Sequence, residues 1–247
     1  MRIKHILPGL AAMVLLTGCF ERKIEQQVTE TFPGGGKKKE IYYQGGRGNI
    51  VRTVFYFEDG KIQSDQRFKL GKPDSLMTIY YKSGNKYKET MFTAGEKNGK
   101  ERSWYENGRL KSEATYEKNT AVGTAVAWHD NGAKESEVSY INGKKDGVEM
   151  HWFADGKDAH LITYANDNIN GVEKKWYPNG NLKLEQNFTA GILDGPYATY
   201  YDNGKMEEKG FYKQGQLHGT KIYWNEKGRK ISEGDYENGE MMEGRTF

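Results

Sequence analysis

Short stretches of alternating hydrophobic and polar residues run through most of the chain. In one of them, Val148, Met150 and Trp152 alternate with Glu149 and His151. Alternation with one polar face is typical of an antiparallel sheet that is exposed to water on one side. Helical periodicity appears nowhere after residue 24. The pattern therefore predicts an all-β protein, an elongated antiparallel meander of repeated β-hairpins with no long helices in the mature chain.

Turn residues recur at a fixed spacing. A glycine, preceded in four cases by Asn, returns every 24 residues at Gly60, Gly84, Gly108, Gly132, Gly156, Gly180, Gly204 and Gly228. Asn-Gly is the strongest short signal for a tight hairpin turn, because both residues tolerate positive φ. A second, looser turn is expected at Gly71, Gly95, Asn119, Gly143, Asp167, Gly191, Gly215 and Gly239. Asn and Asp replace glycine best in left-handed backbone, so positive φ is predicted at Asn119 and Asp167.

Aromatic residues mark two further positions of each unit. Four residues before the turn glycine stand Tyr56, Tyr80, Trp104, Trp128, Trp152, Trp176, Tyr200 and Trp224. Eight residues after it stand Phe68, Phe92, Tyr116, Tyr140, Tyr164, Phe188, Tyr212 and Tyr236. We interpret the two sets as the packing ladder of the sheet, because cross-strand aromatic pairs stabilise sheets. The expected structural residues are Trp104, Trp128, Trp152, Trp176, Trp224, Gly108, Gly132, Gly180 and Gly204.

The residue after the first aromatic varies more. It is Phe57, Tyr81, Tyr105, His129, Phe153, Tyr177, Tyr201 or Asn225. Alternation places this position on the opposite face, where an exposed aromatic stripe would mark a binding surface. Tyrosine suits such a surface because its ring is apolar and its tip is polar. The candidate binding surface consists of Tyr81, Tyr105, Phe153, Tyr177 and Tyr201.

A repeat of this length indicates an array in which each unit stacks on its neighbours. Residues 51–247 form this array, and two strands in each of eight units give about 16 strands. Residues 24–50 are expected to form a degenerate N-terminal capping repeat. This expectation rests on Phe32 and Gly36, which lie 24 residues before Tyr56 and Gly60, and on Glu40 and Tyr43, which match later positions with one residue deleted. The alternative for residues 34–39 is a flexible basic linker beside anionic lipid.

Composition fits an array better than a globular domain. The 247 residues are 36% hydrophobic and 29% charged and include 31 glycines, which leaves little apolar material for a thick core. The aromatic residues, 13% of the chain, are therefore expected to supply most of the buried area. The net charge of +3 falls to +1 without Arg2 and Lys4. This near-neutral balance argues against nucleic acid as a partner.

The start of the chain has the features of a processing signal. Residues 1–18 combine the basic residues Arg2 and Lys4 with an apolar run from Ile6 to Leu16 that is short for a membrane span. The sequence Leu16-Thr17-Gly18-Cys19 resembles the lipobox of bacterial lipoproteins. That resemblance implies cleavage before Cys19, acylation of this single cysteine with palmitate-like chains, and a lipidated tether over residues 19–23. Phe20 rather than Asp favours the outer membrane in a Gram-negative cell, while a plain secretory peptide is the alternative.

The assembled motif resembles the MORN repeat (membrane occupation and recognition nexus). It is most similar to the bacterial 24-residue variant, found in antitoxin-like repeat proteins and secreted lipoproteins. The resemblance covers residues 32–247 and rests on Trp176, Tyr177, Asn179, Gly180, Glu185, Phe188, Gly191, Gly195 and their equivalents. It departs at Leu161 and Lys209, which lack the acid, and at Ser75 and Glu243, which lack the last glycine. It implies a ribbon of hairpins with a recognition role in protein scaffolding or near membranes.

No catalytic constellation is evident. His129, His151, His160 and His218 have neither paired spacing nor a cysteine partner, so no metal or other cofactor is expected. The acids that recur with the repeat are interpreted as turn or cross-strand partners of Lys and Arg. They are Asp65, Glu89, Glu113, Glu137, Glu185 and Glu233.

Three functions remain open after these observations. The first is a non-catalytic, membrane-anchored lipoprotein that serves as a protein-interaction or scaffolding module in the cell envelope, with an immunity or antitoxin-like binder of a toxin as a variant. The second is a glycan or peptidoglycan binder that uses the aromatic stripe. An envelope hydrolase is the weakest of the three. A patch that crosses several repeats would favour the first, and equivalent pockets in each repeat would favour the second.

Overall fold

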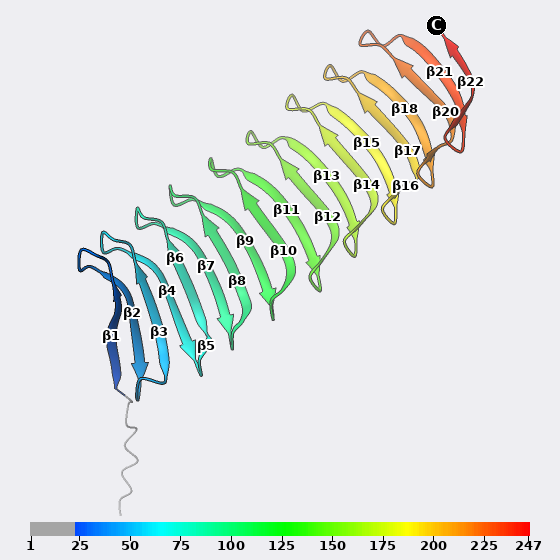
Figure 1. Ribbon diagram of the computed structural model, residues 1–247. Coiled ribbons are helices and arrows are strands. Elements are labelled where there is room, and N and C mark those ends of the chain that lie inside the picture. Colours follow the sequence, from blue (N-terminus) through cyan, green and yellow to red (C-terminus); the bar gives the residue numbers. More distant parts are fainter. Residues whose placement is uncertain (1–22) are drawn as a thin grey trace, which may run out of the picture.

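A computed structural model describes residues 23–247 as one long, open β-sheet (Figure 1). The predicted signal peptide, Cys19 and most of the predicted tether lie outside the described residues. No helix in residues 23–247 has the length and apolar character needed to span a bilayer. The strands are β1 (Ile24–Thr31), β2 (Lys37–Gln44), β3 (Ile50–Tyr56), β4 (Ile62–Lys69), β5 (Lys72–Pro73), β6 (Ser75–Tyr80), β7 (Lys86–Thr93), β8 (Glu96–Trp104), β9 (Leu110–Glu117), β10 (Thr120–Trp128), β11 (Lys134–Ile141), β12 (Lys144–Trp152), β13 (Asp158–Ala165), β14 (Asn168–Trp176), β15 (Leu182–Thr189), β16 (Ile192–Leu193), β17 (Gly195–Tyr200), β18 (Met206–Lys213), β19 (Gln216–Leu217), β20 (Gly219–Trp224), β21 (Lys230–Glu237) and β22 (Glu240–Thr246).

Each strand pairs antiparallel with the next one along the chain. β12, for example, pairs with β11 on one side and β13 on the other. The two-residue strands β5, β16 and β19 are the first parts of the strands that follow them, and β4 therefore also pairs with β6. The fold prediction of an all-β meander of hairpins is confirmed. The strand number exceeds the expected 16 because of these split strands, the N-terminal hairpin and β22.

The turn at the Asn-Gly position is the wider of the two turns. Gly180 has a φ of 96°, while Asn179 is not in the left-handed region. The Gly180 amide donates to the Tyr177 carbonyl at 2.8 Å, and the Tyr177 amide donates to the Asn181 carbonyl at 2.9 Å. This geometry is a three-residue hairpin loop that ends in a left-handed glycine. The expectation of a tight turn with positive φ at both Asn and Gly is wrong here.

The tight turn is the second one, which the sequence pattern indicated as looser. Asn166 and Asp167 have φ values of 50° and 70°, and Ala190 and Gly191 have 50° and 83°. Two successive residues with positive φ give the two-residue turn whose twist matches that of the strands. The predicted positive φ is confirmed at Asn119 (66°) and Asp167. The turn therefore imposes left-handed backbone on a non-glycine residue in every unit.

Asparagine in the wider turn links one repeat to the next. The Asn131 side-chain oxygen accepts from the Ala133 amide at 2.9 Å, and its Nδ2 donates to the Ala154 carbonyl at 2.7 Å. Asp155 stands at the same position of the next unit and cannot donate. There Lys157 Nζ donates to the Pro178 carbonyl at 3.0 Å. Neighbouring turns are thus tied together in both cases.

The last glycine of each motif lies in a bulge. Gly195 has a φ of 123°, and a Cβ at this position would lie 3.0 Å from the Cβ of Asn187. Both the backbone and the lack of space therefore require glycine. In the pairing of β17 with β18, Gly195 stands directly opposite Tyr212. Ser75 takes the same place with a left-handed φ of 69°, whereas Glu243 is not left-handed, so only at Glu243 does the backbone no longer favour glycine.

The two aromatic sets lie on opposite faces of the sheet. Tyr116 pairs with Gly99, and along β8 this position shares a face with Glu101 and Ser103 but not with Trp104. We call the face of Trp104, Trp128, Trp152, Trp176 and Trp224 the tryptophan face. The face of Tyr116, Tyr140, Tyr164, Tyr212 and Tyr236 is the tyrosine face. The interpretation of both sets as one packing ladder is therefore wrong, because the register places them on opposite sides.

A single sheet gives little burial. The buried hydrophobic residues are Tyr43, Val54, Ile162 and Tyr197, and every tryptophan is only partly buried. Polar residues are buried in larger number: Glu40, Thr53, Gln66, Thr78, Glu89, Thr90, Glu149 and Glu173. Burial in this sheet therefore falls more often on polar than on apolar side chains.

The N-terminal hairpin follows the array with a different offset from the predicted one. Phe32 closes a turn with Gly35, as Phe57 does with Gly60. Gly35 has a φ of 82°, while Gly36 is not left-handed. Phe32 is therefore equivalent to Phe57 rather than to Tyr56. Gly35 then lies five and eight residues before Glu40 and Tyr43, as Gly60 does before Asp65 and Phe68, so the predicted single-residue deletion is wrong. The offset comes instead from one extra residue between Tyr43 and Tyr56, which are 13 residues apart where Phe68 and Tyr80 are 12 apart. Residues 37–39 belong to β2, so they are not a flexible linker.

Candidate functional site

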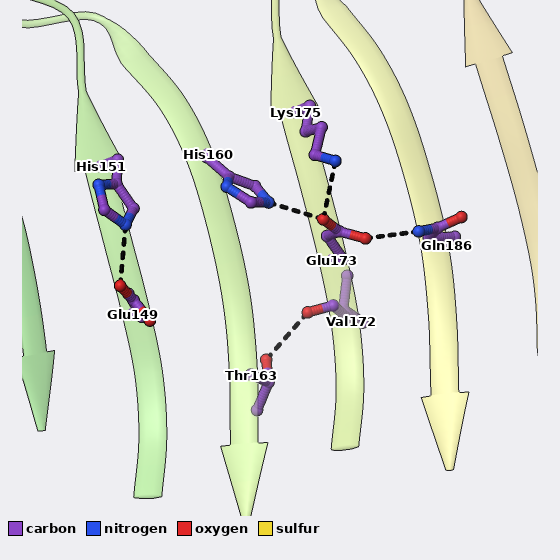
Figure 2. A network of polar contacts seen from close by, with 8 residues as sticks. All are labelled: Glu149, His151, His160, Thr163, Val172, Glu173, Lys175 and Gln186. Atoms are coloured by element: carbon purple, nitrogen blue, oxygen red, sulfur yellow. Dashed lines mark hydrogen bonds and ion pairs between the residues drawn. The ribbon is translucent and has the colours of Figure 1, made fainter. Parts of the chain in front are cut away.

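A cluster of carboxylates and histidines spans β12 to β15 on the tyrosine face (Figure 2). Glu149 lies on β12 and Glu173 on β14, and their residues are 8% and 6% exposed. Both stand opposite Ile162 of the intervening strand β13, one on each side. The pairing of the three strands therefore places two buried acids on either side of one aliphatic side chain.

Glu149 is neutralised by groups from its own strand. Lys145 Nζ lies 2.5 Å from its Oε2, and His151 Nε2 lies 2.9 Å from its Oε1. Burial raises the pKa of Glu149, but the bonds from Lys145 and His151 outweigh it and lower the pKa below its ordinary value. The group is held as a carboxylate with both oxygens occupied.

Glu173 receives its partners from three strands. His160 on β13 contacts its Oε1 at 2.7 Å, and Lys175 on β14 contacts the same oxygen at 3.1 Å. The amide of Gln186 on β15 donates to its other oxygen. Burial raises the pKa of Glu173, but the bonds from Gln186, His160 and Lys175 outweigh it and lower the pKa.

His151 and His160 connect the two acids. They are direct partners in the β12–β13 register, and their rings stack with centroids 6.0 Å apart and an interplanar angle of 27°. The two histidines show no paired spacing along the chain, because they are paired across the β12–β13 hairpin. The signal was available, since residues equidistant from a hairpin turn stand opposite each other.

The two carboxylates of this cluster have no free oxygen. In residues 23–247, no set of three or more His, Cys, Asp or Glu side chains is arranged to hold a metal ion. The four oxygens of Glu149 and Glu173 each accept a bond from a nearby donor. The arrangement can therefore present a fixed polar surface, made of partly buried histidines and lysines, to a bound molecule.

This surface differs from repeat to repeat. The position of Glu149 and Glu173 is occupied in the eight units by Thr53, Met77, Glu101, Ala125, Glu149, Glu173, Tyr197 and Lys221. Glu101 has its own partners, with Lys97 at 2.7 Å and Lys88 at 3.1 Å. The turns and aromatic positions stay constant while this central position changes in size and charge. The binding surface expected from the sequence, the aromatic stripe, does not include this central position.

The recurring acids lie on the tryptophan face and form ion pairs, either across two strands or within one strand. Glu113 contacts Lys100 at 2.6 Å and Arg102 at 2.5 Å, and Lys174 contacts Glu185 at 3.1 Å. Lys134 lies 2.6 Å from Glu137 and also 5.3 Å from the ring centroid of Trp152. The interpretation of these acids as partners of Lys and Arg agrees with this geometry.

The tyrosines of the predicted aromatic stripe form hydrogen bonds between neighbouring repeats. Tyr81, Tyr105, Tyr177 and Tyr201 each donate their hydroxyl hydrogen to the backbone carbonyl of the first aromatic residue in the next repeat, at 2.8–2.9 Å. His129 makes the equivalent contact with the Trp152 carbonyl. These residues and Phe153 are partly buried. They follow the last residue of their strand, so the alternation used to place them as a free stripe does not extend to them.

The other predicted residues have clear places. Gly108, Gly132, Gly180 and Gly204 end the wider turns with φ between 81° and 96°. The tryptophan side chains lie at the strand ends beside these turns. Cys19 lies outside the described residues, so its lipidation stays a prediction.

Comparison with known proteins agrees with the repeat pattern. Three units, residues 97–118, 169–190 and 193–214, match the family described as MORN repeat variant. No curated protein matches the chain significantly.

Solved structures give only distant similarities. The crystal structures of TcdB2-TccC3 and of TcdB2-TccC3-Cdc42 are each 12% identical, with TM-scores of 0.21 and 0.22, over 83% of this chain. The match spans 15% of the length of those chains. A porin-like protein from Bacteroides uniformis ATCC 8492 is 12% identical, with a TM-score of 0.20, over 90% of this chain and 93% of its own. At these TM-scores the similarities carry no conclusion.

The family match, the 24-residue period and the hairpin geometry agree with one another. The chain is a repeat protein with MORN-type repeats, and such repeats indicate a role in protein or membrane interaction.

Proposed function

We propose that this protein is a non-catalytic, membrane-anchored lipoprotein that binds a protein partner in the bacterial cell envelope. The tyrosine face between β8 and β20 is the proposed binding surface. One observation carries the proposal: the central position of this face changes from repeat to repeat while the frame around it stays constant. Repeated identical ligands would select repeated identical pockets, whereas a protein presents a different group at each step.

The electrostatics of the cluster fit recognition rather than catalysis. A general acid or base needs a proton that can move to or from a substrate. The carboxylates of Glu149 and Glu173 are instead held ionised by partners on both oxygens. Fixed polar groups on a rigid sheet give specificity in a protein interface without an ordering cost.

The membrane anchor rests on the sequence alone. Leu16-Thr17-Gly18-Cys19 follows an apolar run of suitable length, and several acyl chains would hold the protein stably on a membrane. In Cys19→Ser we expect loss of acyl chains by mass spectrometry and release of the protein from the membrane fraction. Equal fractionation of wild type and variant would contradict the anchor.

The binding surface is tested separately from the anchor. Wild-type protein from detergent-solubilised membranes is used to capture partners, beside His151→Ala/His160→Ala and the control Val148→Ser. Val148 lies on the tryptophan face of the same strand and is 49% exposed. We expect the double variant to lose a protein that the wild type and the control both retain.

The outcomes of this experiment separate the candidates. Capture of a protein that is unaffected by the double variant would place the interface elsewhere. Binding of purified peptidoglycan by the wild type, without a protein partner, would favour the glycan function instead. A captured toxin would specify the immunity role within the proposed function.

A further inference from the structure

The last described strand of the sheet is paired on one side. β22 pairs with β21, and no other strand in residues 23–247 pairs with it. All its residues are exposed, and Met241, Met242 and Phe247 are among the most exposed hydrophobic side chains, at 63%, 66% and 66%. Figure 1 shows β22 at the opposite end of the sheet from β1. An unprotected edge strand with apolar residues is a template for pairing with another strand.

The hydrogen-bond pattern shows which groups face this edge. The Phe247 amide donates to the Ile231 carbonyl at 2.9 Å, so Phe247 directs its backbone toward β21. Arg245 and Glu243, opposite Glu233 and Asp235, do the same because the direction alternates along an antiparallel strand. Gly244 and Thr246 therefore direct their amides and carbonyls outward, while Met242 lies in a bulge to which this alternation does not extend.

We infer that β22 pairs antiparallel with β22 of a second copy of this chain, about a two-fold axis at Gly244. In this register Gly244 stands opposite Gly244 of the second copy, and Met242 stands opposite its Thr246. Gly244 and Thr246 are the residues whose backbone groups point outward, so the two Gly244 residues exchange two hydrogen bonds. The sheet then continues across the axis from one copy to the other.

Charge selects this register over its neighbours. With the axis at Gly244, Glu243 lies opposite Arg245 of the second copy. The two-fold symmetry also places Arg245 opposite Glu243 of the second copy, so the dimer has two such pairs. Moving the axis to Glu243 or Arg245 keeps the hydrogen-bond pattern but places like charges directly opposite each other, which is destabilising. Glu243 and Arg245 are free to exchange partners, because their contact within one chain is 3.5 Å long and both side chains are more than 60% exposed.

The exposed apolar residues at this end lie on both faces of the sheet. Phe247 shares a face with Glu243 and Arg245, whereas the Met241 sulfur lies 3.3 Å from where a Cβ of Gly244 would be, on the opposite face. The first strand offers no match of charges. β1 carries Glu25 and Glu30 as its only charged residues, so its pairing with a second β1 has no opposite charge to place. A two-fold contact through β22 also closes on itself, which gives a dimer rather than a filament.

The contact is short, so the dimer is expected to be concentration-dependent. The test uses the full chain with Cys19→Ser, so that no acyl chain brings copies together in a micelle. Analytical ultracentrifugation should show a monomer–dimer equilibrium that weakens with added salt. Glu243→Arg should weaken it about tenfold, because two pairs become repulsive in each dimer. Arg245→Glu should do the same.

The decisive variant exchanges the two charges. Glu243→Arg with Arg245→Glu restores opposite charges in the proposed register, so dimerisation should return to the wild-type level. Glu240→Arg is the control, because it makes the same charge change in β22 at a position outside the proposed pairing of Glu243 with Arg245. It should leave dimerisation unchanged, and all variants should keep the wild-type melting temperature, since these side chains are exposed.

Cross-linking tests the register directly. Residues 243 and 245 of opposite copies form a pair with Cα atoms about 4.5 Å apart, which is close enough for a disulfide. Oxidation of a mixture of Glu243→Cys and Arg245→Cys proteins, both in the Cys19→Ser background, should give a covalent dimer. Each variant alone should not, because its two cysteines would be about 8 Å apart. A wild type that stays monomeric, larger oligomers, cross-linking of one variant alone, or no rescue by the charge exchange would overturn the proposal.

Discussion

Glutamate holds positions in this protein that aliphatic residues hold in a thicker core. Glu40 and Val54 are both 1% exposed and are the largest fully buried side chains among the described residues. Glu40 accepts bonds from Gln26, Tyr42 and Tyr56 and an ion pair from Lys37. A buried charge is tolerated when its hydrogen bonds are complete. A sheet with water on both faces supplies such donors from each neighbouring strand.

The ionisation of Glu40 should make stability depend on pH. Burial raises the pKa of Glu40, but the bonds from Lys37, Tyr56 and Gln26 outweigh it and lower the pKa from 4.5 to about 2. A lowered folded-state pKa stabilises the fold above the unfolded value and loses that contribution as the pH falls. We expect the free energy of unfolding to fall between pH 4.5 and about 2, with Glu40 contributing about 3 kcal/mol.

Glu40→Gln should remove most of this contribution at neutral pH and flatten the acid limb of the profile. Glu58→Gln is the control, because Glu58 is exposed in the neighbouring turn. Urea denaturation between pH 2 and 8 measures both variants. Equal acid limbs in wild type and Glu40→Gln would contradict the role of Glu40.

The tyrosine after the strand end should stabilise the contact between repeats. Tyr177→Phe removes the 2.9 Å hydrogen bond to the Tyr200 carbonyl and should cost about 1 kcal/mol. Phe153 stands at the equivalent position without a hydroxyl group. Phe153→Tyr should therefore cost nothing or stabilise the fold, because its hydroxyl could reach the Trp176 carbonyl. If both changes have the same effect on the urea midpoint, the hydroxyl is not the stabilising group.

At the scale of the element, each wider turn depends on a donor to the next turn. Asn131 supplies this donor to the Ala154 carbonyl, and Ala133 offers no alternative. Asn131→Asp should therefore cost about 1 kcal/mol of unfolding free energy. The substitution replaces the amide donor by a carboxylate oxygen that faces the Ala154 carbonyl oxygen. Asn203→Asp should cost less, because Lys205 Nζ already donates to the Lys227 carbonyl at 3.1 Å. Urea denaturation of both variants tests this order.

A second-site change should rescue the first variant. Asp155 and Lys157 form the natural combination of acid and lysine in the next unit. Adding Ala133→Lys to Asn131→Asp recreates that combination and should restore most of the lost stability. A double-mutant cycle measures the coupling. Additive effects of the two substitutions would show that lysine does not replace the asparagine donor.

At the scale of the whole molecule, stability comes from contacts between neighbouring strands. Every strand pairs only with its neighbours along the described chain, so the sheet is long and thin. A compact protein of 225 residues has a radius of gyration of about 17 Å. Small-angle scattering of residues 23–247 should give a clearly larger value, with a maximum dimension typical of a rod. A radius near the compact value would contradict the open sheet.

The sequence by itself determined the properties that depend on neighbouring residues. The 24-residue period predicted the array, alternation predicted strands, and Asn119 and Asp167 predicted left-handed backbone. These properties follow from side-chain direction and φ preferences, which act within a few residues. The residues of the wider turn were also located correctly, although its geometry was not.

The tertiary structure alone decided what depends on register between strands. It determined which turn is tight, which faces carry the two aromatic sets, and that His151 stacks on His160 between two buried glutamates. The bulge at each repeat and the end of each strand interrupt alternation, so alternation could not place Tyr177. Its hydroxyl binds a carbonyl 23 residues away. Such partners become neighbours only when two repeats stack, because the sheet brings equivalent positions side by side.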